Sequence, residues 1–334
     1  MLKDAFQKVL IGKDLTQDEM QAVIGEVMDG NADPIQVAGL LVALRVKGEK
    51  AEEIAGAATA MRARMNRLSL NTKPLLDTCG TGGSGTGSFN ISTATAFVVA
   101  ADDRVSVAKH GNKAVSSLSG SADVLSELNV TITAPLASMQ SAIETIGIGF
   151  LFAPQFHPAM RHAGAIRKSL GIRTIFNLLG PLTNPAGAEH QLMGVFSPEL
   201  PPIIAEVLGK LGAKRAWVVH GSDGVDELTI TGPSHIAEWD GDSVRLMDIS
   251  PEDAGLKPAG PEAMKGGTPQ ENAKVMTQLL GGTYDGPLRD AVALNAGAGL
   301  LVAGVEPDLK SGVSRALDLI AEGAPLEKVR ALAA

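Results

Sequence analysis

The sequence predicts an α/β protein in which a small all-helical domain is joined to a large α/β domain with a mostly parallel central sheet. Residues 1–72 carry only helical periodicity, whereas strand and helix patterns alternate from residue 73 onward. Hydrophobic residues make up 45% of the 334-residue chain, and aromatic residues only 3%. Small apolar side chains at this density suit helices packed on a buried parallel sheet, and this length suits two domains.

The charge and the cysteine content exclude several classes of protein. The formal net charge of −8 disfavours non-specific binding to nucleic acid or to an anionic membrane, although a local basic site for a phosphorylated small molecule is compatible with it. Cys79 is the single cysteine, so no internal disulfide can form, which fits a cytoplasmic protein. The sequence shows no signal-peptide pattern and no apolar stretch of about 18 residues, so we expect no membrane span.

Capping signals define the first helices. Thr16 and Glu19 form a capping box ahead of apolar residues at helical spacing. Asp33, which is followed by proline, starts another helix, and Gly48 ends it. A further helix is expected over 51–65.

The helix expected over 35–47 is apolar almost all round. Such a helix has to be buried on several sides. Two arrangements satisfy this requirement equally well, namely the core of a helical bundle and a contact with a second subunit.

Beyond residue 74 the pattern is that of alternating strands and helices. The expected strands are 75–77, 105–108, 131–133, 216–219, 228–231 and 235–239. The expected helices are 92–101, 121–128, 136–146, 201–211, 269–280, 287–302 and 310–322, with further helical turns in 155–180. The Gly- and Pro-bearing stretch 251–268 is expected to be a surface loop or a lid.

A glycine-rich loop over 80–87 carries the strongest chemical signal. It places five glycines among eight residues, between a short strand and a Ser/Thr-rich helix start. Glycines there let backbone N–H groups point into one concavity, and the helix N-terminus adds partial positive charge. We therefore expect a phosphate or pyrophosphate site and not a flexible connector.

Two other phosphate-binding patterns fit this loop less well. A Walker A loop needs a lysine that this loop lacks. The dinucleotide pattern is formally present as Gly80, Gly82 and Gly85, but it requires an acidic residue at the end of the next strand. That strand ends in Lys109 and His110, and a cation there suits a pyrophosphate better than a ribose hydroxyl.

A second Ser/Gly-rich run follows that next strand. Lys109 is followed by hydroxyl side chains and by another helix start at Gly120 and Ser121. Ligands bind at the carboxyl ends of parallel strands in open α/β sheets, so this run predicts a second anion site that faces the first.

Adjacent carboxylates at Asp226 and Glu227 lie on a glycine-containing turn after a β-branched strand. A lone acidic pair is usually a solvated turn. Next to two phosphate sites, however, it indicates Mg²⁺ held by carboxylates and by substrate phosphates.

The stretch 155–184 carries histidines and several cations. Most of the cations suit a charged helix face, but Arg167 falls among apolar neighbours, where it could bind a carboxylate with two hydrogen bonds. A lone histidine such as His157 is more often structural than catalytic. No Ser/His/Asp triad, HExxH pattern or Cys/His metal cluster occurs.

Together these blocks resemble the anthranilate phosphoribosyltransferases over nearly the whole chain. The blocks that carry the resemblance are the N-terminal helices, 77–83, 89–93, 109–112, 117–125, 156–158, 171–185 and 225–228. The 171–185 and 109–112 blocks are highly specific, whereas the glycine loop alone would not be. The resemblance implies transfer of a phosphoribosyl group from phosphoribosyl pyrophosphate to the amine of anthranilate, in tryptophan biosynthesis.

The resemblance also implies a nucleoside phosphorylase/phosphoribosyltransferase-like fold with the active site between two domains. The small helical domain would be 1–72, completed by about 165–185, and would form a homodimer contact. The large α/β domain would be 73–164 and 186–334. Any coupling to anthranilate synthesis would need a separate anthranilate synthase chain.

Roles for individual residues follow from the same resemblance. The residues implied to bind phosphoribosyl pyrophosphate are Gly80, Gly82, Gly83, Ser84, Asn90, Ser92, Thr93, Lys109 and Ser121. A threonine contact is not applicable at position 88, because that residue is Ser88. The residues implied to bind anthranilate are Gly80, His110, Asn112, His157, Arg167, Gly180 and Pro181. Ser92, Asp226 and Glu227 would place two Mg²⁺ ions per subunit, and no residue is assigned as general base.

The chain departs from the family pattern at Ser84, where the glycine loop usually carries aspartate. The departure removes one negative charge, so altered substrate or metal affinity is expected. Two other functions are compatible with the same fold: a nucleoside phosphorylase, and a non-catalytic relative that binds nucleic acid. The 171–185 block disfavours the first, and the net charge of −8 disfavours the second.

Overall fold

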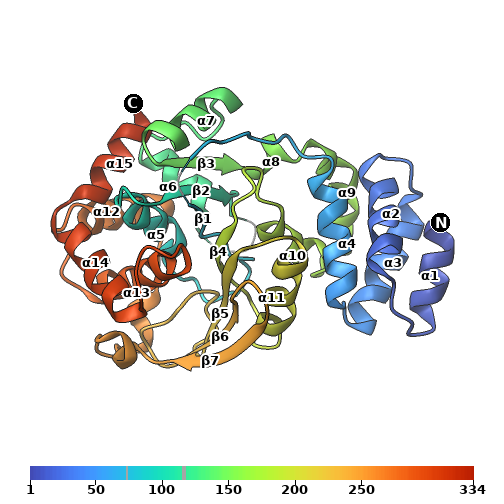
Figure 1. Ribbon diagram of the computed structural model, residues 1–334. Helices are drawn as coiled ribbons and strands as arrows, with labels where there is room; N and C mark the ends of the chain where they lie inside the picture. The colour runs from blue at the N-terminus through green and yellow to red at the C-terminus, as the bar shows by residue number, and fades with distance from the viewer. Residues whose placement is uncertain (73, 115–117) are drawn as a thin grey trace.

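The protein, described here from a computed structural model, has a helical lobe at its N-terminal end and a larger α/β lobe that contains the C-terminus (Figure 1). The structure describes residues 1–72, 74–114 and 118–334. Ser117, with which one of the family blocks begins, and residue 73, taken above as the start of the large domain, lie outside the described residues. No helix in the described ranges is both long and apolar enough to cross a membrane.

The helical lobe begins with four helices whose ends the sequence signals explain. They are α1 (Leu2–Leu10), α2 (Gln17–Met28), α3 (Pro34–Lys47) and α4 (Ala51–Arg62). The capping box is present, because the Thr16 hydroxyl accepts from the Glu19 N–H and the Glu19 carboxylate accepts from the Thr16 N–H. The Asp33 carboxylate caps α3 as expected. Helix α4 ends at Arg62, three residues before the predicted end at 65.

Helix α3 is buried along one face only in this chain. Val37, Leu40 and Leu44 lie in the lobe's core, whereas Ile35 and Val46 are each 82% exposed. The all-round apolar character of this helix is therefore not satisfied within one chain.

The core of the helical lobe continues into later segments of the chain. Helices α9 (Arg161–Leu170) and α10 (Phe176–Leu179) contribute buried side chains to it, as does α11 (Leu200–Lys210) of the larger lobe. Arg62 joins the lobes by donating hydrogen bonds to the carbonyls of Leu182 and Leu211. Because this core runs across both lobes, the division into 1–72 with 165–185 and the remainder stays a prediction.

The larger lobe is built on a seven-stranded sheet with the order β3-β2-β1-β4-β5-β6-β7. The neighbouring strands β3, β2, β1, β4 and β5 pair in parallel. Strand β6 pairs antiparallel with β5, and β7 pairs antiparallel with β6. The mostly parallel sheet is thus confirmed. The strands are β1 (Leu75–Asp77), β2 (Ser106–Gly111), β3 (Ile148–Phe152), β4 (His190–Gly194), β5 (Arg215–Gly221), β6 (Ser234–Trp239) and β7 (Val244–Ile249).

Two predicted strands are wrong, and three strands were missed. Residues 131–133 form a turn, closed by the Ala134 N–H on the Thr131 carbonyl, and the neighbouring strand is β3 instead. Residues 228–231 are not a strand because side chains such as those of Asn295 and Ser234 satisfy their backbone N–H groups. The missed strands are β3, β4 and β7.

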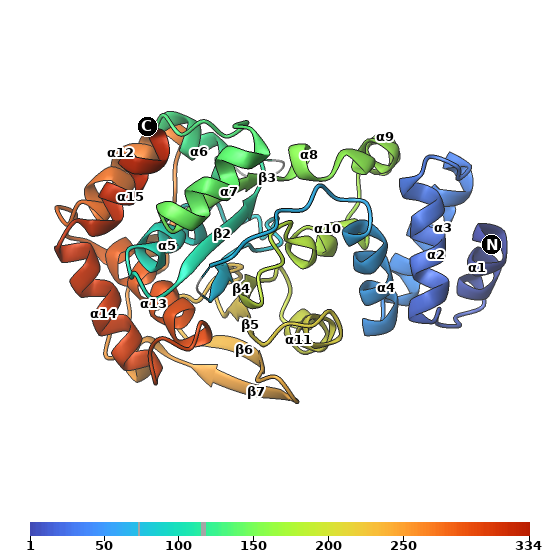
Figure 2. The same cartoon turned by 45° about the horizontal axis from the view of Figure 1, so that its top comes forward.

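Helices cover both faces of the sheet. Trp217 and Val219 of β5 face one core and Ala216 and Val218 face the other, as strand alternation requires. In Figure 2, α11 lies on one side of the sheet and the C-terminal helices lie on the other. The remaining helices are α5 (Ile91–Ala100), α6 (Ser121–Glu127), α7 (Leu136–Thr145), α8 (Ala153–Phe156), α12 (Pro269–Leu280), α13 (Pro287–Val302), α14 (Leu309–Ala321) and α15 (Ala324–Ala333).

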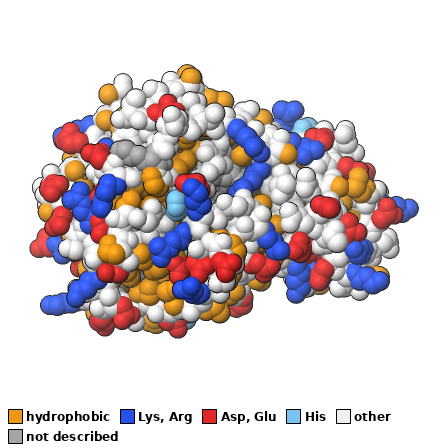
Figure 3. Space-filling view, in the orientation of Figure 1, with side chains coloured by type: hydrophobic (Ala, Val, Ile, Leu, Met, Phe, Trp, Pro, Cys, Tyr) orange, Lys and Arg blue, Asp and Glu red, His pale blue; other side chains and the backbone are white. Residues whose placement is uncertain are grey.

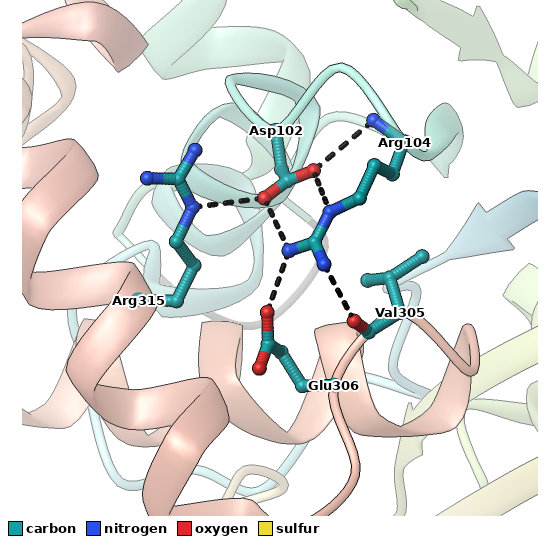
Figure 4. A network of polar contacts seen from close by, with 5 residues as sticks. All are labelled: Asp102, Arg104, Val305, Glu306 and Arg315. Atoms are coloured by element: carbon teal, nitrogen blue, oxygen red, sulfur yellow. Dashed lines mark hydrogen bonds and ion pairs between the residues drawn. The ribbon is translucent and has the colours of Figure 1, made fainter.

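An ion-pair network at Asp102 fastens the turn after α5 to the C-terminal helices (Figure 4). The buried Asp102 carboxylate accepts hydrogen bonds from Arg104 and from Arg315 of α14, each at 2.9 Å. Arg104 also pairs with Glu306 and donates to the Val305 carbonyl. The network thus joins the turn after α5 to residues about 200 positions later in the sequence, at 305–306 and 315.

The stretch 251–268 is structured and packs against the end of the glycine loop. It contains two 3₁₀ turns, Pro251–Ala254 and Pro261–Met264, and buries Met264 in the core of the larger lobe. The Phe89 N–H donates to the Met264 carbonyl at 2.8 Å, and the Gly266 N–H donates to the Gly87 carbonyl at 2.9 Å. This segment therefore supports the glycine loop from one side.

Candidate active site

The predicted site residues lie along one edge of the sheet. Strands β1, β2, β4 and β5 are parallel, so their carboxyl ends meet at the edge that faces the helical lobe (Figure 1). The glycine loop follows β1, Lys109 and His110 end β2, and the carboxylate pair follows β5. On the face shown in Figure 3, basic side chains gather along the boundary between the lobes despite the negative net charge.

The glycine loop has a backbone that only glycine adopts freely. Gly82, Gly83, Gly85 and Gly87 have φ values of +64°, +76°, +76° and +67°. The Ser84 hydroxyl lies 3.1 Å from the Thr86 hydroxyl and bonds with it. The serine that stands where the family usually has aspartate thus forms a hydrogen bond within the loop.

Position 88 directly follows the last glycine of the loop. It is occupied by Ser88, so no threonine contact applies at this position. Ser88 is half-buried and forms an isolated antiparallel bridge with Lys265. Its backbone therefore serves to fasten the loop to the stretch 251–268.

The carboxylate pair lies directly beneath the glycine loop. Asp226 Oδ2 accepts from the Gly82 N–H at 2.9 Å, and Glu227 Oε1 accepts from the Ser92 N–H, at the start of α5, at 3.2 Å. A side-chain methyl on Gly80 would lie 3.1 Å from Asp226 Oδ2, so the loop passes close to this carboxylate. The structure therefore brings together the three residues predicted as metal ligands.

The electrostatics of the pair suit a cation. Burial, together with the neighbouring charge of Asp226, raises the pKa of Glu227 to about 8, and Lys109 partly opposes this shift. With a pKa of about 8, Glu227 is largely protonated at neutral pH when no cation is bound, and a cation beside the pair would stabilise its charged form. Hard oxygen ligands with excess negative charge are what Mg²⁺ prefers, so these residues fit that ion.

Gly194 at the end of β4 makes room for the carboxylate turn. A Cβ atom at this position would lie 1.6 Å from the Asp226 carbonyl oxygen, which no packing adjustment can tolerate. The sequence analysis missed this residue, because a glycine at the end of an unpredicted strand gave no signal.

Lys109 is buried at the end of β2, with 3% of its surface exposed. Its Nζ donates to the Thr78 carbonyl at 3.2 Å, directly before the glycine loop. A buried ammonium with one acceptor among the described residues has N–H groups left for an anionic ligand.

The second Ser/Gly-rich run is joined to the end of β2 by hydrogen bonds. The Asn112 carbonyl accepts from the Ser121 hydroxyl at 3.2 Å and from the Ala122 N–H at 3.1 Å. This contact brings the start of α6 to the edge of the sheet that bears Lys109.

Asn90 lies at the centre of another small network. Its Oδ1 accepts from the Ser119 hydroxyl at 3.0 Å and from Asn272 at 2.8 Å, and its Nδ2 donates to the Ser119 carbonyl. Thr93, in the first turn of α5, is buried and donates its N–H to the Asn90 carbonyl. Asn272, on α12, was not foreseen as a neighbour of the site.

His110 and His157 form a buried pair. Their Nε2 atoms lie 3.2 Å apart, and His110 Nδ1 lies 3.0 Å from the Gly180 carbonyl oxygen. Because that carbonyl can only accept, Nδ1 of neutral His110 carries the proton, which leaves His110 Nε2 as an acceptor facing His157. Burial lowers the pKa of His110 to about 3 and that of His157 to about 4, so both rings are neutral.

Asp77 and Asn184 hold His110 in place. The His110 N–H donates to Asp77 Oδ1 at 3.2 Å, and the Asn184 amide donates to Asp77 Oδ2 at 2.7 Å and to the Ala108 carbonyl at 2.8 Å. Burial raises the pKa of Asp77 to about 6, against the opposing charge of Lys109. Both residues lie inside family blocks, but their pattern alone assigned them no role.

Arg167 and Pro181 stand apart from the other predicted residues. The Arg167 guanidinium lies 5.7 Å from the centroid of the Phe176 ring, and burial lowers its pKa. In the described part of the chain it forms no hydrogen bond with another predicted site residue. The Pro181 carbonyl accepts from the Gln191 amide at 2.6 Å.

Arg173 reaches the glycine loop, a contact that the sequence analysis did not foresee. Its guanidinium donates to the Gly83 carbonyl and lies 4.3 Å from the centroid of the Phe196 ring. It follows α9 in the segment that leads back from the helical lobe.

Two family models together match most of the chain. The helical bundle domain of a glycosyl transferase family matches residues 3–65, and the a/b domain of that family matches residues 72–326. The chain thus belongs to a glycosyl transferase family.

Relatives narrow this class further. The anthranilate phosphoribosyltransferase of Syntrophobacter fumaroxidans is 48% identical over 99% of this chain and 98% of its own, and that of Brevibacillus brevis is 50% identical over 98% and 96%. The crystal structure of the Thermus thermophilus enzyme matches with a TM-score of 0.94 and 49% identity, over 99% of this chain and 98% of its own. The chain therefore belongs to the anthranilate phosphoribosyltransferase family.

A Saccharomyces cerevisiae member of this family extends the comparison to a complex. It matches with a TM-score of 0.89 and 28% identity over 98% of this chain and 96% of its own, and its structure is in complex with PRPP and Mg. A second structure of that enzyme, with a TM-score of 0.89 and 26% identity over 99% of this chain and 96% of its own, is in complex with 4-fluoroanthranilate.

Proposed function

We propose that the protein transfers the 5-phosphoribosyl group of phosphoribosyl pyrophosphate to the amine of anthranilate, which gives N-(5-phosphoribosyl)anthranilate and pyrophosphate in tryptophan biosynthesis. One observation carries the proposal: the glycine loop, Lys109 and the Asp226–Glu227 pair converge on one strand edge. The convergence provides donors for a pyrophosphate and ligands for its counter-cation. The complex of the yeast relative with PRPP and Mg supports this assignment.

The donor substrate is bound by backbone N–H groups and by cationic and hydroxyl side chains. The residues assigned to it are Gly80, Gly82, Gly83, Ser84, Asn90, Ser92, Thr93, Lys109 and Ser121. Lys109 and the N-terminus of α5 stabilise the negative charge that the departing pyrophosphate gains.

Ser92, Asp226 and Glu227 hold Mg²⁺, with two ions per subunit. When bound, Mg²⁺ neutralises pyrophosphate charge and orients the leaving group. The raised pKa of Glu227 supports this assignment, because a cation beside the pair stabilises the charged form of both carboxylates.

Anthranilate is bound by Gly80, His110, Asn112, His157, Arg167, Gly180 and Pro181. The neutral histidine pair presents ring faces and no positive charge, which suits an uncharged arylamine. Arg167, near the same segment, binds the carboxylate of anthranilate.

The protein's contribution to the reaction is positioning and exclusion of water. As the bond between the ribose C1 and the pyrophosphate breaks, C1 gains positive charge, and the amine attacks the opposite face with inversion. An arylamine with a free lone pair needs orientation more than deprotonation, so no general base is assigned. Closure of the helical lobe on the larger lobe keeps water from the reacting C1.

The assembly belongs to the same proposal. The exposed apolar side chains of α3 support a homodimer contact through the helical lobe. That lobe comprises 1–72 completed by about 165–185, and the large domain comprises 73–164 and 186–334. The single buried cysteine suits the cytoplasm. A separate anthranilate synthase chain is a candidate partner.

Anthranilate fluorescence provides the test. Loss of the signal is followed after addition of phosphoribosyl pyrophosphate, with and without Mg²⁺. We expect a Mg²⁺-dependent loss that disappears in Asp226→Asn/Glu227→Gln and persists in the control Asp248→Asn, which removes an exposed carboxylate elsewhere.

An unchanged signal in the wild type under every metal condition would refute the transfer. Phosphorolysis of thymidine or uridine would then indicate a nucleoside phosphorylase, and a salt-sensitive gel shift with DNA would indicate nucleic-acid binding.

A further inference from the structure

Asn295 lies in the middle of α13 and is fully buried among apolar side chains. Its Oδ1 accepts a hydrogen bond of 3.0 Å from the Leu228 N–H, and its Nδ2 donates one of 2.8 Å to the Leu228 carbonyl. A third bond of 2.9 Å joins Nδ2 to the Ala291 carbonyl, one turn earlier in the helix. Both amide hydrogens are therefore used, and only one acceptor position is left over.

The residue held by Asn295 directly follows the carboxylate pair. The Leu228 N–H belongs to the peptide unit that joins Glu227 to Leu228, so Asn295 fixes the peptide from which the Glu227 side chain projects. Residues 228–231 form no strand, so no ladder of backbone hydrogen bonds fixes this peptide. The two bonds from Asn295 take the place of that ladder.

An amide at this position is costly for the helix itself. Helix α13 packs closely on its neighbours, and a methyl group on Gly299 would lie 3.0 Å from Val99 and 3.1 Å from Leu76. Asparagine is a poor helix former, and its polar atoms must be desolvated in such a core. An apolar residue would suit the helix better, so the feature that explains Asn295 is its contact with the carboxylate turn.

The other supports of the turn act at different points. Gly194 lies against the Asp226 carbonyl oxygen, and Ser234 accepts from the Thr229 N–H at 2.9 Å. Neither contacts the peptide unit between Glu227 and Leu228. Asn295 is therefore the side chain that sets this peptide.

We propose that Asn295 is a positioning residue for the metal site, and that it sets where the Asp226 and Glu227 carboxylates stand relative to the glycine loop by holding the Leu228 peptide. The inference rests on the proposed function only in taking these carboxylates as cation ligands. Residues that orient metal ligands change metal affinity by about 10–100-fold when they are removed.

The test measures metal binding apart from catalysis. Mn²⁺ is titrated in the presence of pyrophosphate, and free Mn²⁺ is followed by electron paramagnetic resonance. The variants are Asn295→Leu, of similar volume, and Asn295→Ser, which remains available if the leucine variant does not fold. Val292→Ala is the control, because Val292 is fully buried on the same helix, so its truncation lowers stability, and its apolar side chain has no group that can hydrogen-bond to the Leu228 peptide.

Both Asn295 variants are expected to bind Mn²⁺ at least about tenfold more weakly than the wild type, at a temperature where circular dichroism shows them folded. Val292→Ala is expected to keep the wild-type affinity despite a lower melting temperature. In the transfer assay the Mg²⁺ concentration for half-maximal rate rises in parallel, whereas the KM for anthranilate does not change.

Wild-type Mn²⁺ affinity in folded Asn295→Ser would overturn the inference, as would equal weakening in Val292→Ala. A wild-type protein that binds Mn²⁺ with pyrophosphate but does not consume anthranilate would refute the proposed function alone. In that case the dependence of Mn²⁺ binding on Asn295 would still decide the inference.

Discussion

The backbone N–H of Gly82 donates a hydrogen bond of 2.9 Å to the Asp226 carboxylate, across 144 positions of sequence. The glycine loop and the turn that carries Asp226 and Glu227 are thus in direct contact. A change that displaces one of them is therefore expected to displace the other. The first two predictions depend on this coupling.

Gly194→Ala should displace the turn that carries Asp226 and Glu227. The added methyl would lie 1.6 Å from the Asp226 carbonyl oxygen, so the turn must move. We expect kcat/KM for phosphoribosyl pyrophosphate to fall by at least about tenfold, with a higher Mg²⁺ requirement, because misplaced ligands lose metal affinity. Steady-state kinetics at several Mg²⁺ concentrations measures this. Gly164→Ala is the control, since a methyl there meets nothing within 4 Å, and equal kinetics for both variants would contradict the clash.

Ser84→Asp should restore the charge that the family usually carries in the loop. The present Ser84 hydroxyl bonds with Thr86, so an aspartate would bring a new negative charge toward the proposed pyrophosphate and cation site. We expect the apparent constants for Mg²⁺ or phosphoribosyl pyrophosphate to change while the KM for anthranilate stays. Initial rates over a grid of Mg²⁺ and donor concentrations test this. If neither constant moved, the loop position would have no electrostatic role.

His157→Gln should weaken the dependence of stability on acid pH. The folded pKa of about 4 lies below the unfolded value near 6.5, so the unfolded chain binds a proton first as the pH falls. The free energy of unfolding therefore falls between these values, by up to about 1.4 kcal/mol per pH unit for this histidine. The glutamine variant lacks this contribution to the pH dependence. Urea denaturation at several pH values measures the free energy of unfolding. An equal slope in His157→Gln and in the wild type would show that His157 is not held neutral.

Asp102→Asn should destabilise the protein at neutral pH. The hydrogen bond from Arg104 is the main cause that holds the pKa of Asp102 far below its usual range, and Arg315 adds to it. We expect the free energy of unfolding to fall by about 2 kcal/mol at pH 7, because two arginines lose their buried partner. This contribution is complete above about pH 4 and is lost as the pH falls toward the folded pKa of Asp102. The free energies of unfolding of Asp102→Asn and of the wild type should therefore converge in acid.

Urea denaturation at pH 7 and at acid pH measures this convergence. Asp318→Asn, on the exposed side of α14, is the matched control and should behave like the wild type. A constant difference between Asp102→Asn and the wild type across the acid range would contradict the ion-pair explanation.

Charges on the exposed face of α3 should break the proposed homodimer. Ile35 and Val46 are each 82% exposed in the single chain, and burying a carboxylate in an apolar contact is unfavourable. Ile35→Glu/Val46→Glu is therefore expected to sediment as a monomer while the wild type sediments as a dimer. Leu246→Glu changes an equally apolar residue that is 67% exposed on β7 and should remain dimeric. A monomeric wild type would remove the dimer from the proposal.

Local features were predictable wherever a short stretch of sequence contains its own physical cause. The capping box of Thr16 and Glu19 was correct because each partner lies within one helical turn of the other. The strand at 75–77 followed by the glycine loop was equally readable. The strand at 228–231 was wrong because the side chain of Asn295, 67 positions away, binds the backbone of Leu228, which no local pattern reveals.

The sequence by itself determined the helical lobe, the mostly parallel sheet and the family, because periodicity, capping and long specific motifs are all local. Only the tertiary structure decided which of the marked residues meet. Parallel strands bring their carboxyl ends to one edge, and there Gly82 reaches Asp226 and His110 reaches His157. Supports such as Gly194 and Asn295 exist only in three dimensions, because a glycine is required by the backbone opposite it, and a buried amide by the peptide that it holds.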